Sequence, residues 1–299
     1  MCALLLAVHC WTVECLVQCR PSTLRTTVHT RRTPSPIATA DAERLKNELL
    51  AAIPTRPFGA PATNVTSDAP TISRIEALAR QLEGVSPFAG QPFADNPEAI
   101  RTLAGGWRLV YSDASEITRL VKLPLGFKLG AVFQAIDAST AMFENQALVK
   151  HSLLLLSGHT RVVAKFWLSD DLGATNRAGV TNTAGNRVNV KFQRAIFTLR
   201  RLILLPTFGG VRKVAQPNGP SEQAGVVPSI DVTYLDESLR ISRGGDGSLF
   251  VLRRADGADR GQGQPMRMLG EDSAELAVTA ESTYNAATDV LPGSGANGA

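Results

Sequence analysis

The chain has 299 residues, of which 44% are hydrophobic, a composition that is ordinary for a soluble globular protein of one or two domains. Its formal net charge of +4 is unevenly distributed: residues 1–40 hold four arginines and one glutamate, whereas residues 41–299 hold 27 basic and 26 acidic side chains. A nucleic-acid-binding protein usually concentrates basic charge on its folded part, so nucleic acid is not an expected partner. No window reaches the roughly 18 uninterrupted apolar residues of a membrane-spanning helix, so we do not expect an integral membrane protein.

Residues 1–40 have the composition of a targeting presequence. Residues 20–40 are rich in Arg, Ser and Thr and contain no acidic residue, as organelle transit peptides do. The apolar run over residues 2–8 resembles the core of a secretory signal, so the presequence has either one part or two. All four cysteines precede residue 20, and their spacing makes no Cys-x-x-Cys arms. We therefore expect no metal site, and no disulfide or thiol nucleophile in the cysteine-free remainder.

Two helices are predicted to follow. Apolar residues recur at helical spacing over residues 41–53, with Asp41 as a plausible N-cap. Residues 54–70 contain four prolines and are expected to form a loop. A second apolar stripe predicts a helix over residues 71–82, which Gly84 ends.

From residue 105 onward, short segments alternate apolar and polar side chains, which is the period of a half-buried strand. Long loops are expected over residues 170–186 and 206–228. A series of short strands predicts a barrel or a sandwich, and a barrel of about eight strands leaves room for side chains or one small ligand. We expect strands over residues 105–112, 131–137, 141–149, 151–157, 161–169, 187–199, 229–235, 238–243 and 248–254.

The segment from Ile230 to Arg253 carries the strongest signal in the chain. Its alternating residues predict a β-hairpin that closes a sheet, with the turn at Gly244-Gly-Asp-Gly247. This turn lacks the glycine spacing and the following helix of a phosphate-binding loop. We therefore interpret its glycines as positions that allow a positive φ.

The amino-acid sequence of these segments resembles that of the plastid lipid-associated proteins, also called the fibrillin or plastoglobulin family, over roughly residues 42–254. The resemblance rests on Tyr234-Leu-Asp, Leu239-Arg-Ile-Ser-Arg-Gly244 and Leu249-Phe-Val-Leu252, preceded by Trp107-Arg-Leu-Val-Tyr111 and by a glutamine-centred strand at residues 131–137. It implies a mainly β fold, a lipocalin-like antiparallel β-barrel preceded by one or two short helices. The expected domains are a plastid presequence (1–40), a helical segment (41–97), the barrel (98–254) and a flexible tail (255–299) that is rich in Gly, Ala, Asp and Ser.

The resemblance implies a non-enzymatic plastid protein without cofactors. Such a protein binds hydrophobic metabolites (prenyl lipids, carotenoids or fatty acids), or peripherally coats plastoglobules and thylakoid margins. Two other classes stay open: an interaction module that supports a plastid prenyl-lipid biosynthetic enzyme, and a small barrel isomerase. The residues agree with the absence of catalysis, because the only two histidines after the presequence, His151 and His159, are expected at opposite ends of one strand.

The apolar interior of the barrel is the candidate ligand site. Each of its large side chains also fits a filled core, and a Tyr hydroxyl or an Arg near the mouth would orient a ligand. The candidates for the lumen are Leu109, Tyr111, Phe133, Phe143, Phe166, Phe192, Tyr234 and Phe250.

The resemblance assigns structural roles to Trp107, Asp236, Arg240, Arg243 and Gly244. In lipocalin-like barrels a first-strand Trp stacks on an Arg of a late strand, so Trp107 is expected to contact Arg243, with Arg240 as the alternative. Asp236 is expected either to pair with one of these arginines or to cap the turn between its two strands.

The apolar run that begins at residue 199, beside basic residues, has two interpretations. It is either a buried strand end with solvated arginines or an interfacial loop that touches a lipid surface. The candidates for membrane contact are Leu204, Leu205, Phe208, Arg200 and Arg201. Residues 120–127 are a second candidate loop.

Overall fold

In the computed structural model of the chain, residues 36–121, 123, 126–151, 156–169, 172–175, 181–202, 205–215 and 227–255 are described. The predicted presequence up to residue 35 and the predicted tail from residue 256 lie outside the described residues, and both stay predictions. Within the described residues, no helix combines the length and the apolar character that crossing a bilayer requires.

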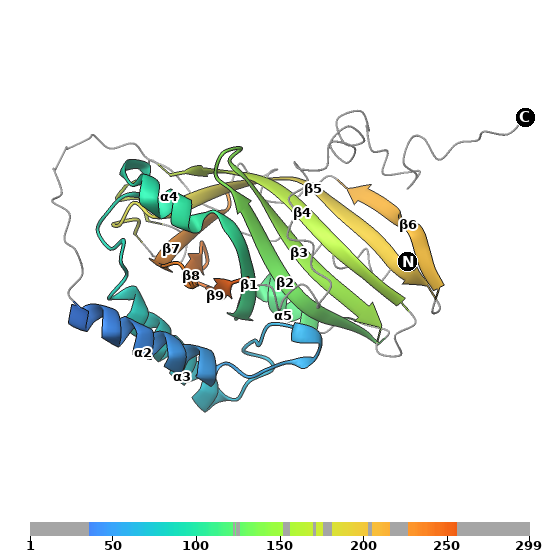
Figure 1. Ribbon diagram of the computed structural model, residues 1–299, viewed down its shortest axis with the longest axis horizontal. Helices are drawn as coiled ribbons and strands as arrows, with labels where there is room; N and C mark the ends of the chain where they lie inside the picture. The colour runs from blue at the N-terminus through green and yellow to red at the C-terminus, as the bar shows by residue number, and fades with distance from the viewer. Residues whose placement is uncertain are drawn as a thin grey trace, which may run out of the picture.

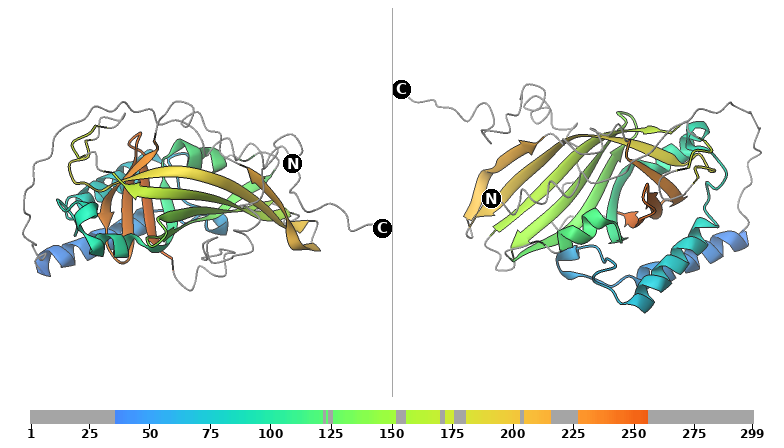
Figure 2. Two further views of the ribbon diagram at one scale, coloured as in Figure 1. Left: turned by 90° about the horizontal axis from the view of Figure 1, so that it is seen from above. Right: turned by 180° about the vertical axis from the view of Figure 1, so that it is seen from behind.

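The described strands form one antiparallel sheet in the order β4-β3-β2-β1-β9-β8-β7-β5-β6. Because β4 also pairs with β5, eight of them close into a ring, and β6 lies outside it along β5 (Figures 1 and 2). The predicted mainly β fold, preceded by helices, is therefore confirmed. The strands are β1 (Gly105–Ser112), β2 (Phe127–Asp137), β3 (Met142–His151), β4 (Leu156–Leu168), β5 (Arg187–Leu202), β6 (Leu205–Ala215), β7 (Ser229–Leu235), β8 (Leu239–Gly244) and β9 (Leu249–Arg254).

Two predictions about segment boundaries are wrong. The break expected between the strands 151–157 and 161–169 is absent, because β4 runs continuously from Leu156 to Leu168, and β6 occupies the first part of the loop expected over 206–228. In β6 a proline and two glycines interrupt the alternating pattern that identified the other strands. An edge strand tolerates such residues, since one side of its backbone needs no partner, and Pro206 pairs with Arg201 at the start of the β5–β6 ladder.

The ring closes through a short ladder between β5 and β7. Three residue pairs form this ladder, from Asn189 opposite Ser229 at the start of β7 to Arg187 opposite Asp231, after which β7 leaves β5. The Arg187 guanidinium donates to the Asp231 carboxylate from Nε (2.6 Å) and Nη2 (3.0 Å), and the two side chains are 3% and 5% exposed. Arg187 Nη1 also donates to the carbonyl of Ala174 (3.3 Å). This bidentate pair therefore fastens the ladder that completes the ring.

Two helices precede the ring. α2 (Pro36–Ala52) extends further toward the N-terminus than predicted, so Asp41 lies inside it and the prediction of an N-cap there is wrong. α3 (Ala69–Glu83) is capped by Asp68, whose carboxylate accepts from the Thr71 amide at 2.9 Å. Shorter helices are η1 (Pro57–Gly59), η2 (Phe93–Asp95), α4 (Pro97–Leu103) and α5 (Ser115–Val121).

Helices α2 and α3 lie side by side on the outer face of the ring, below β7, β8, β9 and β1 (Figure 1). They share one core with residues of these strands, separate from the core inside the ring. The outer core consists of Leu45, Leu49, Ala62, Ile75, Leu78, Ala79, Leu82, Tyr111, Tyr234, Leu239, Ile241, Leu249 and Val251. The apolar residues of β8 thus face the helices rather than the interior of the ring.

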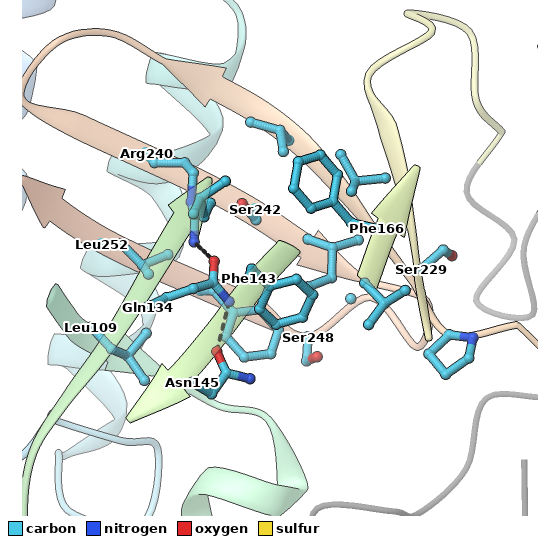
Figure 3. Close-up of a pocket in the computed structure, with 18 of the residues that line it drawn as sticks. Leu109, Gln134, Phe143, Asn145, Phe166, Ser229, Arg240, Ser242, Ser248 and Leu252 are labelled. Carbon is cyan, nitrogen blue, oxygen red and sulfur yellow. Dashed lines mark hydrogen bonds between the residues drawn. The ribbon is translucent and has the colours of Figure 1, made fainter. Parts of the chain in front are cut away.

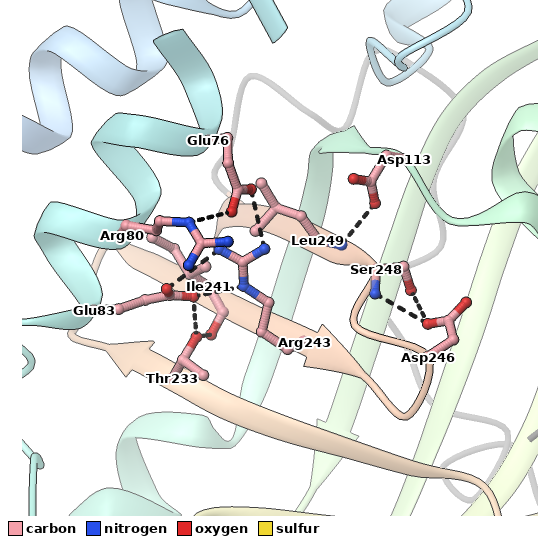
Figure 4. A network of polar contacts seen from close by, with 10 residues as sticks. All are labelled: Glu76, Arg80, Glu83, Asp113, Thr233, Ile241, Arg243, Asp246, Ser248 and Leu249. Carbon is pink, nitrogen blue, oxygen red and sulfur yellow. Dashed lines mark hydrogen bonds and ion pairs between the residues drawn. The ribbon is translucent and has the colours of Figure 1, made fainter. Parts of the chain in front are cut away.

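Polar contacts fasten α3 to β8 at the edge of this outer core (Figure 4). Arg243 donates to Glu83 from Nε (2.8 Å) and to Glu76 from Nη1 (3.0 Å). The Thr233 hydroxyl donates to Glu83 at 2.8 Å. Burial opposes the charge of Arg243, but the two glutamates outweigh it and raise the pKa of the guanidinium.

A second network fastens α2 to the turn between β7 and β8. Lys46 Nζ donates to Asp236 Oδ2 (2.7 Å), which also accepts from the Tyr234 hydroxyl (2.7 Å). Asp236 Oδ1 accepts from the amides of Ser238 and Leu239, both at 2.8 Å. Asp236 therefore caps the turn, as one of the two expectations had it. The cation that pairs with Asp236 is Lys46 of α2 rather than an arginine.

The stability of the wild-type protein is expected to fall more steeply between pH 5 and pH 3 than that of Asp236→Asn. Burial raises the pKa of Asp236, but Lys46, Tyr234 and the turn amides outweigh it and hold the pKa below its ordinary value. The stability that this carboxylate contributes is thus complete above its unfolded value of about 3.9 and is lost as pH falls through the lower folded value. Urea midpoints measured across this range test the expectation; parallel curves for the two proteins would contradict it.

Candidate functional site

The ring encloses a cavity of about 180 Å³ (Figure 3). Apolar side chains from β1 to β5, from β7 and β9, and from α4 and α5 provide most of its lining. The turn between β8 and β9 borders it as well. In that turn Gly247 has a φ of +84°, and its amide donates to the Gly244 carbonyl at 2.8 Å, which confirms the predicted reversal.

Six of the eight predicted lumen residues border this cavity: Leu109, Phe133, Phe143, Phe166, Phe192 and Phe250. Phe143 and Phe192 meet edge to face, with ring centroids 6.4 Å apart. For Tyr111 and Tyr234 the prediction is wrong, because both belong to the outer core under α2 and α3.

Two β-bulges explain the misplaced tyrosines. In β1, Leu109 pairs with Leu252 but Tyr111 pairs with Val251, so one extra residue lies between them. Leu109 and Tyr111 therefore face opposite sides of the sheet, although residues two apart in a regular strand share a face. A second register shift, between Val232 and Tyr234 in β7, has the same effect.

Polar side chains also line the cavity, and those of Gln134, Asn145, Arg240 and Ser242 come from β2, β3 and β8 (Figure 3). The Arg240 guanidinium donates from Nη2 to Gln134 Oε1, and Gln134 Nε2 donates to Asn145 Oδ1 at 2.8 Å. Arg240 is 4% exposed, and burial together with the nearby charge of Arg254 lowers its pKa to about 9. The side chain therefore keeps its charge at neutral pH while it borders an apolar space.

Sequence reasoning missed this polar group. The sequence led us to expect the orienting Tyr or Arg near the mouth of the barrel. Arg240 is instead the second residue of β8 and lies away from the turn that follows this strand. The available signal was the alternation in Leu239-Arg-Ile-Ser: if the apolar residues face outward, the arginine and the serine must face inward.

Trp107 is fully buried and contacts two guanidinium groups. The central carbon of Arg254 lies 3.9 Å from the centroid of the indole ring, and that of Arg240 lies 5.2 Å from it. The prediction that Arg243 is the first partner of Trp107 is wrong, because Arg243 faces α3 on the other side of β8. The alternative, Arg240, is confirmed as a contact, and Arg254 is the closer partner that the sequence did not indicate.

Comparison with known proteins identifies the family of the chain. Residues 43–253 match the family model described as PAP_fibrillin. The chain belongs to the PAP/fibrillin family. A curated relative from Arabidopsis thaliana, "Plastid-lipid-associated protein 6, chloroplastic", is 29% identical over 194 residues, which are 60% of this chain and 61% of that protein. The chain thus spans less than two thirds of the relative's length. No solved structure matches the chain.

In this fibrillin the end of the cavity nearest the β8–β9 turn is acidic. Glu116 of α5 and Asp246 of the turn both border the cavity. Burial raises the pKa of Glu116, and the charge of Asp246 raises it further. The two ends of the cavity therefore differ in charge, with Arg240 at one and two carboxyl groups at the other.

The expected membrane-contact loop of this fibrillin is largely a strand pair. Arg200 and Arg201 belong to β5, Leu205 and Phe208 belong to β6, and Leu204 lies outside the described residues. Contact of these residues with lipid stays a prediction. In the second candidate loop, Leu120 is buried in the inner core and cannot reach a membrane surface in this conformation.

Proposed function

We propose that the chain is a plastid lipid-associated protein that holds one hydrophobic metabolite in the cavity of its strand ring. The observation that carries this proposal is the apolar cavity itself, which six predicted aromatic and aliphatic residues border. Burial of apolar surface contributes about 25 cal/mol per Å², so such a lining favours an apolar ligand. Plastid localisation rests on the family and on the name of the chloroplastic relative.

The protein acts by binding rather than by catalysis. The polar groups of the cavity include two amides, a guanidinium and a hydroxyl. Two carboxyl groups, those of Glu116 and Asp246, also border the cavity, but the Ser242 hydroxyl has no hydrogen-bond partner among the described residues, so neither carboxyl group is placed as its general base. Among the described residues, no three His, Cys, Asp or Glu side chains come together in a way that would hold a metal ion. The polar groups are suited to orient a ligand through hydrogen bonds and charge.

The full chain, purified in the presence of plastid lipid extract, is expected to carry one apolar molecule in native mass spectrometry. Val190→Phe, which places a larger side chain in the lining, is expected to lose that molecule. Val85→Phe is the matched control, because Val85 is 40% exposed and lies outside the ring. Melting curves of both variants verify that the fold is intact.

Two outcomes would contradict this function. An empty wild-type protein that still floats with liposomes would make the chain a surface coat, and replacement of Leu204 and Leu205 by Asp would then test the β5–β6 segment as the contact. Turnover of a bound lipid that one point substitution abolishes would instead make the protein an isomerase or another enzyme.

A further inference from the structure

Arg240 differs from the other buried arginines of the described chain in having no acidic partner. Arg187 pairs with Asp231, Arg161 with Glu144, and Arg243 with Glu76 and Glu83. No described carboxylate lies within 4.0 Å of the Arg240 guanidinium, and no acidic group contributes to its pKa shift.

Burial without a counter-ion is costly, because a charged group that leaves water is normally paired or neutralised. The protein compensates Arg240 only in part, through the oxygen of Gln134 and the face of Trp107. The Arg240 Nε has no hydrogen-bond partner among the described residues, and neither does the buried hydroxyl of Ser242. Both belong to residues that line the cavity.

The neighbours of Arg240 hold it in a fixed position. Gln134 turns its oxygen toward Arg240 because its amide nitrogen donates to Asn145 at 2.8 Å (Figure 3). Trp107 lies across another side of the guanidinium, and its own indole N–H donates to the Leu103 carbonyl at 2.8 Å. A preorganised guanidinium that borders an apolar space and whose Nε has no hydrogen-bond partner among the described residues is suited to bind an anion.

We infer that the ligand of the cavity carries a single carboxylate on an apolar body and binds with the carboxylate against Arg240. This rests on the proposed function and selects, among hydrophobic metabolites, an apolar carboxylic acid over a neutral molecule. A guanidinium binds a carboxylate through short, charge-assisted hydrogen bonds, and Ser242 lies two residues along the same face of β8.

The charge at the two ends of the cavity fixes the orientation of the ligand. Arg240 attracts an anionic head group at its end of the cavity, whereas the end beyond β8 is bordered by Glu116 and Asp246 and offers no such cation. The body of the ligand then lies along Leu109, Phe143 and Phe166. A cavity of about 180 Å³ is small beside the roughly 300–1,000 Å³ of common ligand pockets, so a single medium-length chain fits better than a two-chain lipid.

The test compares three probes of one chain length on the delipidated full-length protein: decanoate, methyl decanoate and decanol. In calorimetric titration at pH 7.5, decanoate is expected to bind at least about tenfold more tightly than the ester. The reason is that hydrogen bonds to charged groups are stronger than those between neutral groups. Arg240→Gln is expected to reduce decanoate binding to the level of the ester and to leave the ester unchanged. Lys165→Gln removes an exposed charge of β4 and is expected to behave as the wild type.

The comparison of the three probes on the wild-type protein decides the inference even if Arg240→Gln fails to fold. Equal or tighter binding of the ester or the alcohol would overturn the carboxylate head group while leaving the proposed function standing. A preference for decanoate that persists in folded Arg240→Gln would also overturn it. If no probe binds and the lipid-loaded protein is empty as well, the proposed function itself fails.

Discussion

Replacing Trp107 with alanine is expected to lower the free energy of unfolding by about 3–5 kcal/mol. The indole is 0% exposed, so its loss leaves a cavity in the inner core of the ring. It also deprives Arg254 and Arg240 of the aromatic face that they contact and leaves the Leu103 carbonyl without the indole N–H. Urea denaturation followed by far-UV circular dichroism measures the change without relying on tryptophan fluorescence.

Trp167→Ala provides the matched control. Trp167 lies in β4 and is 43% exposed, so the same truncation at this position is expected to change the free energy of unfolding by less than about 1 kcal/mol. A Trp107 variant no less stable than the Trp167 variant would show that neither the inner packing nor the stacking on Arg254 holds the ring together.

Asp231→Leu is expected to destabilise the protein by about 3–5 kcal/mol, because it leaves the Arg187 guanidinium buried without its counter-ion. The pair lies in the short β5–β7 ladder, so the loss acts where the ring closes. Urea denaturation measures the stability, and hydrogen exchange of the amides of β7 reports whether this ladder opens first.

The double variant Arg187→Met, Asp231→Leu separates the cost of an unpaired charge from the worth of the pair. Replacing both partners with apolar side chains is expected to recover most of the lost stability, as is common for buried ion pairs. A double variant as unstable as Asp231→Leu alone would show that the pair itself, through its geometry, is required to close the ring.

Most of the ring was predictable because its strands show a period of two. β1 was predicted to its last residue, and the β8–β9 hairpin was identified from its glycine turn. The two helices were also predicted, since α3 carries a regular apolar stripe between a proline-rich loop and a glycine. These features depend on local sequence, in which side-chain alternation and chain breakers are directly visible.

What could not be predicted depends on long-range register. A single inserted residue in β1 and another in β7 moved Tyr111 and Tyr234 to the outer face, and no local residue pattern marks those bulges. The direction of β8 was equally ambiguous. Its apolar residues face α2 and α3, so Arg240, the alternative partner of Trp107, contacts the indole and borders the cavity, whereas Arg243, the partner expected first, faces α3.

The outer core places a limit on where the chain can be cut. Leu45 and Leu49 of α2 cover the apolar outer face of the ring, and Lys46 of the same helix neutralises Asp236. Cleavage after this helix would expose a contiguous apolar surface over β8 and β9, which promotes aggregation. It would also leave Asp236 beside that surface without Lys46. A cut at the end of the predicted presequence, after residue 40, would leave Leu45, Lys46 and Leu49 in place over this surface.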